Sequence, residues 1–256
     1  VIPKNDLLTF GKVRLAYGKT GNDANPYYTI TQYVQAYADG YYGADIAKFP
    51  MNGINSFILS TRAGSNTLKP EMNSEFETGL NLQFFNGRFG IDAAYYNRIT
   101  SDQIFTLPID PSTGYNNAVV NFGEVRNRGV ELLLNTTPIS TKDFRWDLDI
   151  NFALNKNKVL SMPKSLEGGK VTIYRFSAGN DAVYMYAEEG KPMGTYYTYL
   201  PQYVTDKSSQ YYGYQIVDEA GQPKLDKEVS YTGLDMNHKW TGGINTTLSS
   251  HGFSLS

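Results

Sequence analysis

The sequence predicts an all-β fold, an antiparallel transmembrane β-barrel of which this chain forms part. Several segments alternate apolar and polar residues with period 2, which is typical of strands with one apolar and one polar face. The connectors between these segments alternate strictly between short and long. No run of about 18 apolar residues is present, so the sequence predicts no transmembrane helix, but barrel strands hide their apolar residues in alternation.

The clearest strand spans residues 144–154. One face carries Phe144, Trp146, Leu148, Ile150, Phe152 and Leu154, and the other carries Arg145, Asp147, Asp149, Asn151 and Ala153. At about 3.3 Å per residue the segment is roughly 33 Å long, and tilted by about 40° it covers the roughly 25 Å apolar band of an outer-membrane barrel. A long strand of a soluble β-sandwich alternates equally well, so this strand alone leaves both interpretations open.

The first predicted strand is short, at residues 12–19, and Thr20-Gly21-Asn22-Asp23 ends it with turn-forming residues. A long irregular connector, residues 20–73, follows. It is rich in tyrosine. Structureless loops of this length are uncommon unless they are functional.

The second and third strands are predicted at residues 75–85 and 89–99. Asn86-Gly87 between them is a strong hairpin signal, because a type I′ turn needs positive φ at both central residues. A second long connector, residues 100–124, contains Pro108 and Pro111.

The fourth strand is predicted at residues 129–137, where Pro138 is expected to end it because proline cannot donate to a β-ladder. The fifth strand is the one at 144–154. The longest connector, residues 156–238, is expected to hold a hairpin around residues 195–203. A strand at 240–248, a tight turn at 250–252 and a new strand from Phe253 complete the chain.

The order of connectors argues for a barrel. In an antiparallel meander alternate connectors lie at the same end, so the short turns share one end and the long loops share the other. Bacterial outer-membrane barrels have this layout, and a Greek-key sandwich has no reason to sort its loops in this way.

Several segments resemble SusC/RagA-type TonB-linked outer-membrane proteins, in the order that this family has them. They are Tyr-Gly-Lys-Thr-Gly-Asn at 17–22, Leu-Lys-Pro-Glu at 68–71, Glu-Thr-Gly-Leu at 77–80, Phe-Phe-Asn-Gly-Arg at 84–88, the Tyr95-Tyr96 pair, residues 121–132 with Asn-Arg-Gly-Val-Glu, and Lys-Trp-Thr-Gly-Gly at 239–243. Each motif is weak alone, and together they are specific.

The resemblance implies a parent protein with a plugged barrel of roughly 22 strands, short periplasmic turns and long extracellular loops. It implies import of an oligosaccharide or a peptide, a SusD-like surface lipoprotein as a lid, and energy from a TonB complex that contacts a missing N-terminal part. It also implies the outer membrane of a Gram-negative, Bacteroidetes-like cell, with the barrel wall against its lipid. We expect the plug and the targeting segment to lie upstream of residues 1–256, which form part of one barrel domain.

The sequence gives little support to other chemistry. Net charge is −2, which predicts no nucleic-acid partner, and the absence of cysteine excludes thiolate sites. His238 and His251 are predicted in turns without a third ligand, Glu188-Glu189 fits a surface loop, and residues 218–223 have too few oxygen ligands for a calcium loop. We therefore predict no catalytic residue, no metal, no cofactor and no enzymatic activity.

Two sets of residues are candidates for function. Aromatic loop side chains can stack on sugars and hydrogen-bond through their hydroxyls, and barrel loops are also rich in structural tyrosine. The candidates for substrate binding are Tyr27, Tyr28, Tyr33, Tyr37, Tyr41, Tyr42 and Tyr115. The candidates for the lumen-facing side are Asp92, Arg98, Glu131, Arg145, Asp147 and Asp149.

Two alternatives remain open at this stage. A passive outer-membrane porin needs no plug, and seven or eight strands nearly close a small barrel. A soluble β-rich glycan-binding module needs no membrane and predicts solubility without detergent.

Overall fold

The computed structural model describes residues 7–35, 52–163, 169–176 and 182–256. The chain divides into two compact units: one comprises residues 1–20, 73–100 and 124–256, and the other residues 21–72 and 101–123. Within the described residues, no helix has both the length and the apolar character needed to cross a membrane.

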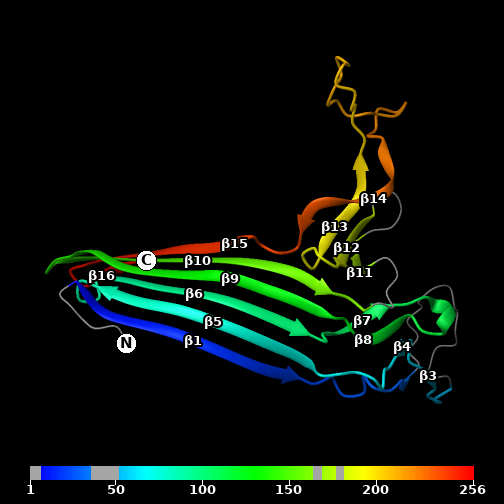
Figure 1. The fold of residues 1–256 in the computed structure, drawn as a ribbon, viewed down its shortest axis with the longest axis horizontal. Coiled ribbons are helices and arrows are strands. Elements are labelled where there is room, and N and C mark those ends of the chain that lie inside the picture. Colours follow the sequence, from blue (N-terminus) through cyan, green and yellow to red (C-terminus); the bar gives the residue numbers. More distant parts are fainter. Residues whose placement is uncertain (1–6, 36–51, 164–168, 177–181) are drawn as a thin grey trace. The chain divides into compact units, whose positions relative to one another are not determined.

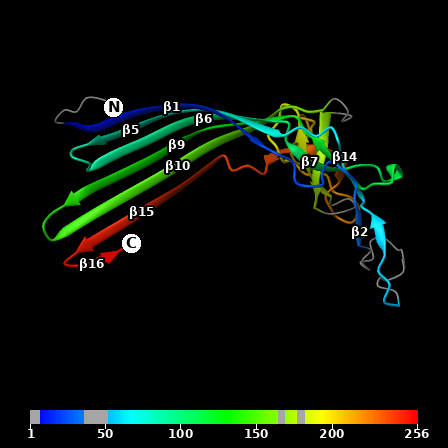
Figure 2. The same ribbon diagram turned by 90° about the horizontal axis from the view of Figure 1, so that it is seen from below.

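A seven-stranded sheet forms most of the first unit (Figure 1). Its strands lie side by side in chain order, interrupted only by strands inside the long connectors, and the view from below shows the same order (Figure 2). They are β1 (Leu8–Asn22), β5 (Glu71–Phe84), β6 (Phe89–Ser101), β9 (Glu124–Ser140), β10 (Phe144–Ser161), β15 (Trp240–Ser250) and β16 (Phe253–Leu255). This is the up-and-down sheet that the alternation predicted.

The three short turns lie at one end of this sheet (Figure 1). Asn86 and Gly87 have φ of 57° and 84°, as the Asn-Gly prediction requires, and His251 and Gly252 have 49° and 85°. Phe85 also has a positive φ of 52°. The β5–β6 turn thus holds three successive left-handed residues, closed by bonds from Gly87 N to Phe84 O and from Arg88 N to Phe85 O.

Most strands are longer than predicted. β10 continues from Leu154 to Ser161 and β9 begins at Glu124, five residues before the predicted start. The prediction that Pro138 ends its strand was wrong, because β9 runs through it to Ser140. The register between β9 and β10 shifts between Trp146 and Leu148, opposite Ile139 and Thr136. Pro138 therefore lies in a β-bulge, where a missing N–H is tolerated.

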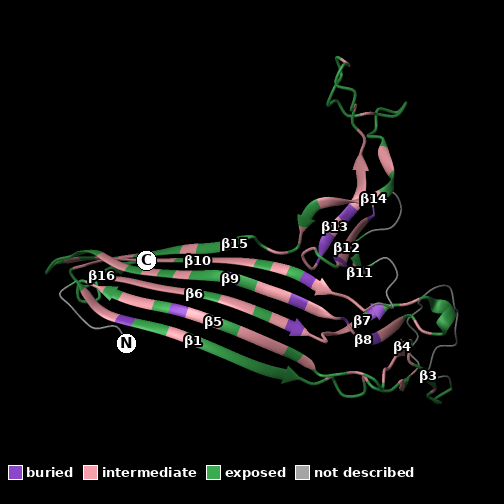
Figure 3. Cartoon of the chain, in the orientation of Figure 1, coloured by how far each residue is buried: buried purple, intermediate pink, exposed green. Residues whose placement is uncertain are grey.

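The register places like with like across β9, β10 and β15. Ile150 lies between Leu134 and Ile244, and Asp149 lies between Asn135 and Asn245. One face is therefore apolar and the other polar over the span 144–154. Most residues of these strands are half-buried or exposed, with few buried positions along the sheet (Figure 3).

The longest connector contains a second sheet instead of a single hairpin. Its order is β11 (Lys170–Arg175), β12 (Val183–Glu188), β13 (Thr195–Pro201) and β14 (Leu225–Asp235), all antiparallel neighbours. The hairpin expected around 195–203 is the β13 segment, which pairs with β12 and β14. Its turn at 190–193 joins the end of β10, where Val159 N donates to Lys191 O and Gly190 N donates to Val159 O.

The second unit is built from the other two long connectors. It holds β2 (Tyr33–Gln35) paired with β3 (Phe57–Leu59), and a sheet of β4 (Arg62–Ala63), β8 (Asn117–Asn121) and β7 (Ile104–Pro108). A short 3-10 helix, η1 (Pro111–Thr113), precedes β8. The β4–β8 pair is parallel, an exception to the antiparallel pattern. Buried Leu107, Val119 and Phe122 form its apolar centre.

Candidate functional site

The polar face of the seven-stranded sheet brings all six predicted lumen-facing residues onto one side. Asp92 and Glu131 line one shallow hollow of about 340 Å³, and Arg98 and Glu131 line a second of about 480 Å³. Glu131 lies opposite Ala153, which shares its face of β10 with Asp149, Asp147 and Arg145. That this face looks into a lumen remains a prediction.

An ion pair ties β1 to β6 across β5. The Arg14 guanidinium donates to both oxygens of Asp92, at 2.6 and 2.9 Å, and Asn81 donates to the same carboxylate at 2.6 Å. Gly79 makes this possible, because a Cβ there would lie 2.8 Å from Arg14 Nη2. The glycine of the Glu-Thr-Gly-Leu motif thus leaves the space through which the Arg14 side chain reaches Asp92.

A second cross-strand contact involves Gly129, the glycine of the Asn-Arg-Gly-Val-Glu motif. Tyr96 on β6 donates its hydroxyl to Asn155 Oδ1 on β10 at 3.1 Å. Gly129 on β9 lies beneath it: a Cβ there would be 2.7 Å from the Tyr96 hydroxyl and 2.2 Å from Leu154 O. An aromatic ring over a strand glycine shields backbone that has no side chain of its own.

The remaining predicted charges are also engaged. Arg98 forms a bidentate pair with Glu75, from Nε to Oε2 at 3.0 Å and from Nη2 to Oε1 at 3.1 Å. Arg145 donates twice to Asp147, which also accepts from Thr137. Asp149 accepts from Asn135 at 2.8 Å. Most of the predicted polar face is therefore a structural network.

Two carboxylates differ from this pattern. Within the part of the chain that the structure describes, the side chains of Glu77 and Glu131 make no hydrogen bond or ion pair, and both line the two hollows. Both carboxylates therefore have free acceptors for a ligand or a neighbouring domain. Sequence reasoning did not single out Glu77, although its position in the Glu75-x-Glu77-x-Gly79 alternation places it on the polar face.

The predicted loop tyrosines do not form one cluster in the described residues. Tyr27 and Tyr33 are exposed, Tyr28 is half-buried beneath the Arg62 guanidinium at 4.6 Å, and Tyr115 is half-buried next to η1. Tyr37, Tyr41 and Tyr42 lie outside the described residues.

The structure shows a tyrosine cluster that the sequence analysis did not predict. The Tyr197 ring packs edge-on against Tyr186, with centroids 4.9 Å apart, and lies 5.5 Å from Tyr231. Lys191 and Lys170 lie over these rings. The signal was present, because Tyr184 and Tyr186 alternate, as do Tyr197 and Tyr199.

A hydrogen-bonded triad supports this cluster. Tyr197 donates to Glu188, and Lys191 Nζ lies 2.7 Å from Tyr197 Oη and 3.0 Å from Glu188. Burial acts to raise the pKa of Glu188, but the bonds from Tyr197 and Lys191 outweigh it, so this pKa lies below its usual value. The bond to Tyr197, with the charge of Glu188, raises the pKa of Lys191. Burial and the bond to Glu188 raise that of Tyr197.

No group of three His, Cys, Asp or Glu side chains gathers in the described ranges. The Asp218 carboxylate accepts from the backbone N of Ala220 and Gln222 and so closes its own turn.

Comparison with known proteins agrees with this architecture. A family model described as TonB dependent receptor-like, beta-barrel matches residues 5–248. The TonB-dependent receptor SusC of Bacteroides thetaiotaomicron is 29% identical over 231 residues, which is 86% of this chain and 22% of that protein. The TonB-dependent receptor P26 of Formosa agariphila is 34% identical over 158 residues, 60% of this chain and 15% of that protein.

Among solved structures, the RagAB peptide transporter matches with a TM-score of 0.70 and 22% identity, over 98% of this chain and 26% of that one. The chain thus spans between 15% and 26% of the length of these proteins. The matched proteins are receptors and transporters and not enzymes, as predicted. Since the family model covers nearly all of the sequence and the fold agrees, the chain belongs to the TonB-dependent receptor β-barrel family and is of the SusC/RagA type.

Proposed function

We propose that this chain is part of the wall of an outer-membrane, TonB-dependent importer of oligosaccharides or peptides. Its polar face lines the lumen, its apolar face contacts lipid, and its short turns lie in the periplasm. The observation that carries the proposal is the division of one sheet into a charged, internally bonded face and an exposed apolar face.

The apolar face supports a lipid environment. Leu15 and Ile244 are each 74% exposed and Trp240 is 64% exposed, on strands at both sides of the sheet. Soluble monomers rarely expose contiguous apolar patches larger than a few hundred Å². In a bilayer the same side chains contact hydrocarbon, which disfavours the soluble glycan-binding module.

The partners follow from the family. A SusD-like lipoprotein would cap the barrel, and the TonB complex would act through the plug domain of the whole receptor. The exposed loop tyrosines support an oligosaccharide, because their rings can stack on sugars. A peptide is the second candidate, because the structural neighbour RagAB is described as a peptide transporter.

Uptake by whole cells tests the proposal. Cells that carry or lack the intact receptor are supplied with labelled oligosaccharides or peptides, with and without a functional TonB complex. Receptor-dependent and TonB-dependent uptake of one class is expected. Uptake that persists without TonB would instead indicate a passive porin, and recovery of the receptor without detergent would indicate a soluble module.

The unpaired carboxylates sharpen the test. Replacing Glu77 and Glu131 with glutamine is expected to lower uptake without lowering the amount of assembled barrel, since neither side chain bonds within the described sheet. Glu189→Gln, at an exposed turn, is the matched control. Unchanged uptake in the double variant would exclude a role for these two groups.

A further inference from the structure

The outer face of β9 and β10 changes its chemistry along the strands. From the short-turn end it is apolar, through Ile150, Phe152 and Leu154 on β10. Beyond that point the same face carries Lys156 and Lys158, opposite Arg128 and Arg126 on β9. This change also explains why the apolar alternation stops before the strands do. We call these four residues the basic cluster.

The register brings the positive charges of the cluster together, and their repulsion is unfavourable when no anion is bound. Lys156 pairs with Arg128, and Lys158 pairs with Arg126, so like charges lie directly opposite each other. Arg128, Lys156 and Lys158 are exposed and Arg126 is half-buried. Across the described ranges, none of the four side chains forms an ion pair or hydrogen bond with the protein.

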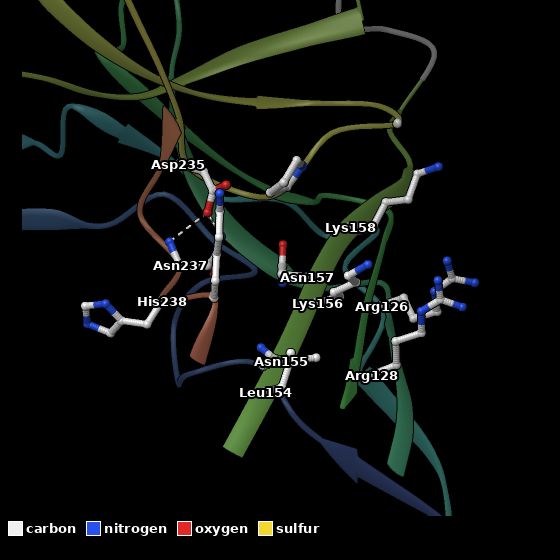
Figure 4. A pocket seen from close by; sticks show the side chains of 13 residues that line it. Arg126, Arg128, Leu154, Asn155, Lys156, Asn157, Lys158, Asp235, Asn237 and His238 are labelled. Atoms are coloured by element: carbon white, nitrogen blue, oxygen red, sulfur yellow. Dashed lines mark hydrogen bonds between the residues drawn. The ribbon is translucent and has the colours of Figure 1, made fainter. Parts of the chain in front are cut away.

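A pocket of about 420 Å³ lies against the cluster (Figure 4). The turn at Gly190 and Pro192 and the segment 235–239 form its other walls. Its lining holds five basic side chains, counting Lys239, and one acidic side chain, Asp235. The Asp235 carboxylate already accepts from the backbone and side-chain nitrogens of Asn237, at 2.9 and 3.0 Å. The pocket therefore favours an anion.

An aromatic pair lies on the same face of the sheet as the basic cluster. Phe152 and Trp240 stack with centroids 6.2 Å apart, on the apolar side of the cluster. Aromatic girdles mark the interfaces of outer-membrane barrels. Lys156 lies four residues beyond Phe152, about 13 Å along the strand. Along the strands, apolar side chains are thus followed by the aromatic pair and then by the basic cluster. Acyl chains, interface and headgroups follow one another in the same order in one leaflet of a membrane.

We propose that the basic cluster binds the phosphate groups of a phosphorylated lipid headgroup in the outer leaflet around the barrel. The inference rests on the proposed function insofar as it places this face against lipid. Arginine forks bind phosphate oxygens bidentately and lysines add point charges, and basic pockets between membrane elements bind lipid headgroups. The lining also includes Asn155, which accepts from Tyr96 on the polar side, so a soluble lumenal anion is the competing ligand that the inorganic-phosphate arm of the test addresses.

The test uses the intact receptor purified in mild detergent. The variant combines Arg126→Gln, Arg128→Gln, Lys156→Gln and Lys158→Gln. The control combines Lys142→Gln, Lys207→Gln, Lys224→Gln and Lys227→Gln, which removes the same charge at exposed positions outside the cluster. Native mass spectrometry measures co-purified lipid and the rebinding of a bis-phosphorylated glycolipid, its dephosphorylated form and inorganic phosphate.

Wild type and control are expected to bind the phosphorylated glycolipid, and the cluster variant to bind it at least about tenfold more weakly. Equal binding by variant and control, equal binding of the dephosphorylated lipid, or binding of inorganic phosphate as tight as that of the lipid would overturn the proposal. So would a cluster variant that binds the lipid normally but no longer captures the SusD-like lipoprotein in a pull-down, because this result would assign the cluster to a protein partner.

Two further measurements keep the outcome clear. Heat-modifiability on gels reports assembly, and if the fourfold variant does not assemble, the pairs Arg126→Gln/Lys158→Gln and Arg128→Gln/Lys156→Gln replace it. Membrane fractionation of wild type and control tests the proposed function separately. If both are recovered without detergent, the proposed function as part of a membrane barrel is wrong. If the cluster variant stays in the membrane but loses its lipid, only the role of the basic cluster in lipid binding is at issue.

Discussion

The Tyr96 hydroxyl on β6 lies 3.1 Å from Asn155 Oδ1 on β10 and reaches it across Gly129 on the strand between them. A Cβ at position 129 would meet the backbone oxygen of Leu154 at 2.2 Å, a contact that no side-chain rotation relieves. We expect Gly129→Ala to destabilise the barrel by about 2–3 kcal/mol. The temperature at which the folded gel band converts to the unfolded one measures this.

Gly90→Ala is the matched control for that substitution. Gly90 lies in β6, and a Cβ there would find its nearest atom at 3.8 Å, an ordinary contact. A similar loss of heat resistance in both variants would contradict the steric role of Gly129.

The Arg14–Asp92 pair predicts a coupling between two positions on neighbouring strands. Gly79→Ala should displace the Arg14 guanidinium, since the new Cβ would lie 2.8 Å from Nη2, and cost about 1–2 kcal/mol. In an Arg14→Ala background the same change should cost almost nothing. A double-mutant cycle on heat resistance measures this coupling, and additive effects would show that Gly79 serves another purpose.

The assignment of faces predicts opposite outcomes for adjacent residues. Leu148→Arg places a charge on the lipid-facing side and is expected to block assembly, at about 2–4 kcal/mol near the midplane. Asp147→Asn keeps an acceptor for Thr137 on the polar side and should be mild. The amount of folded barrel in outer-membrane fractions is the measurement, and equal assembly of both variants would refute the assignment.

The Glu188–Lys191–Tyr197 triad predicts how the β12–β13 pair responds to pH. The lowered pKa of Glu188 means that its contribution is present above its ordinary value of 4.5 and is lost as pH falls through the folded pKa. The raised pKa values of Lys191 and Tyr197 mean that their contributions are present at neutral pH and are lost only above about 10.

Hydrogen exchange of the β12 and β13 amides should therefore be constant between about pH 5 and 9, after correction for the intrinsic rate, and protection should fall in acid. Glu188→Gln should remove the acid response and reduce the alkaline one, because the Glu188 carboxylate helps to raise the pKa of Lys191 and of Tyr197. An identical acid response in wild type and variant would assign it to another group.

Sequence alone predicted the seven-stranded sheet well because one face is apolar and the other polar, a contrast that period 2 reveals. The predicted strands ended early at Leu154 and began late at Gly129 because the apolar face becomes basic there while the ladder continues. The prediction at Pro138 failed because a bulge tolerates the missing donor, and whether a bulge forms there depends on the register with β10.

The contacts between distant strands could not be predicted. Arg14 and Asp92 are 78 positions apart, and their pairing depends on a register set across a long connector. The β11–β14 sheet was missed because its strands carry aromatic residues that stack on each other, so they lack the contrast of faces that marks the wall. The family motifs predicted the positions of Gly79 and Glu131, whereas the neighbours that give each its role came only from the structure.

The short turns and long connectors differ in how they tolerate insertion. Doubling a flexible loop costs only about 0.6 kcal/mol in closure entropy, so a long connector can gain residues with little loss of stability. The β5–β6 turn has no such freedom, because one added residue beside the left-handed run at Phe85, Asn86 and Gly87 would shift the register and send each side chain to the opposite face. The connectors can therefore change in length while the strands of the sheet keep their register.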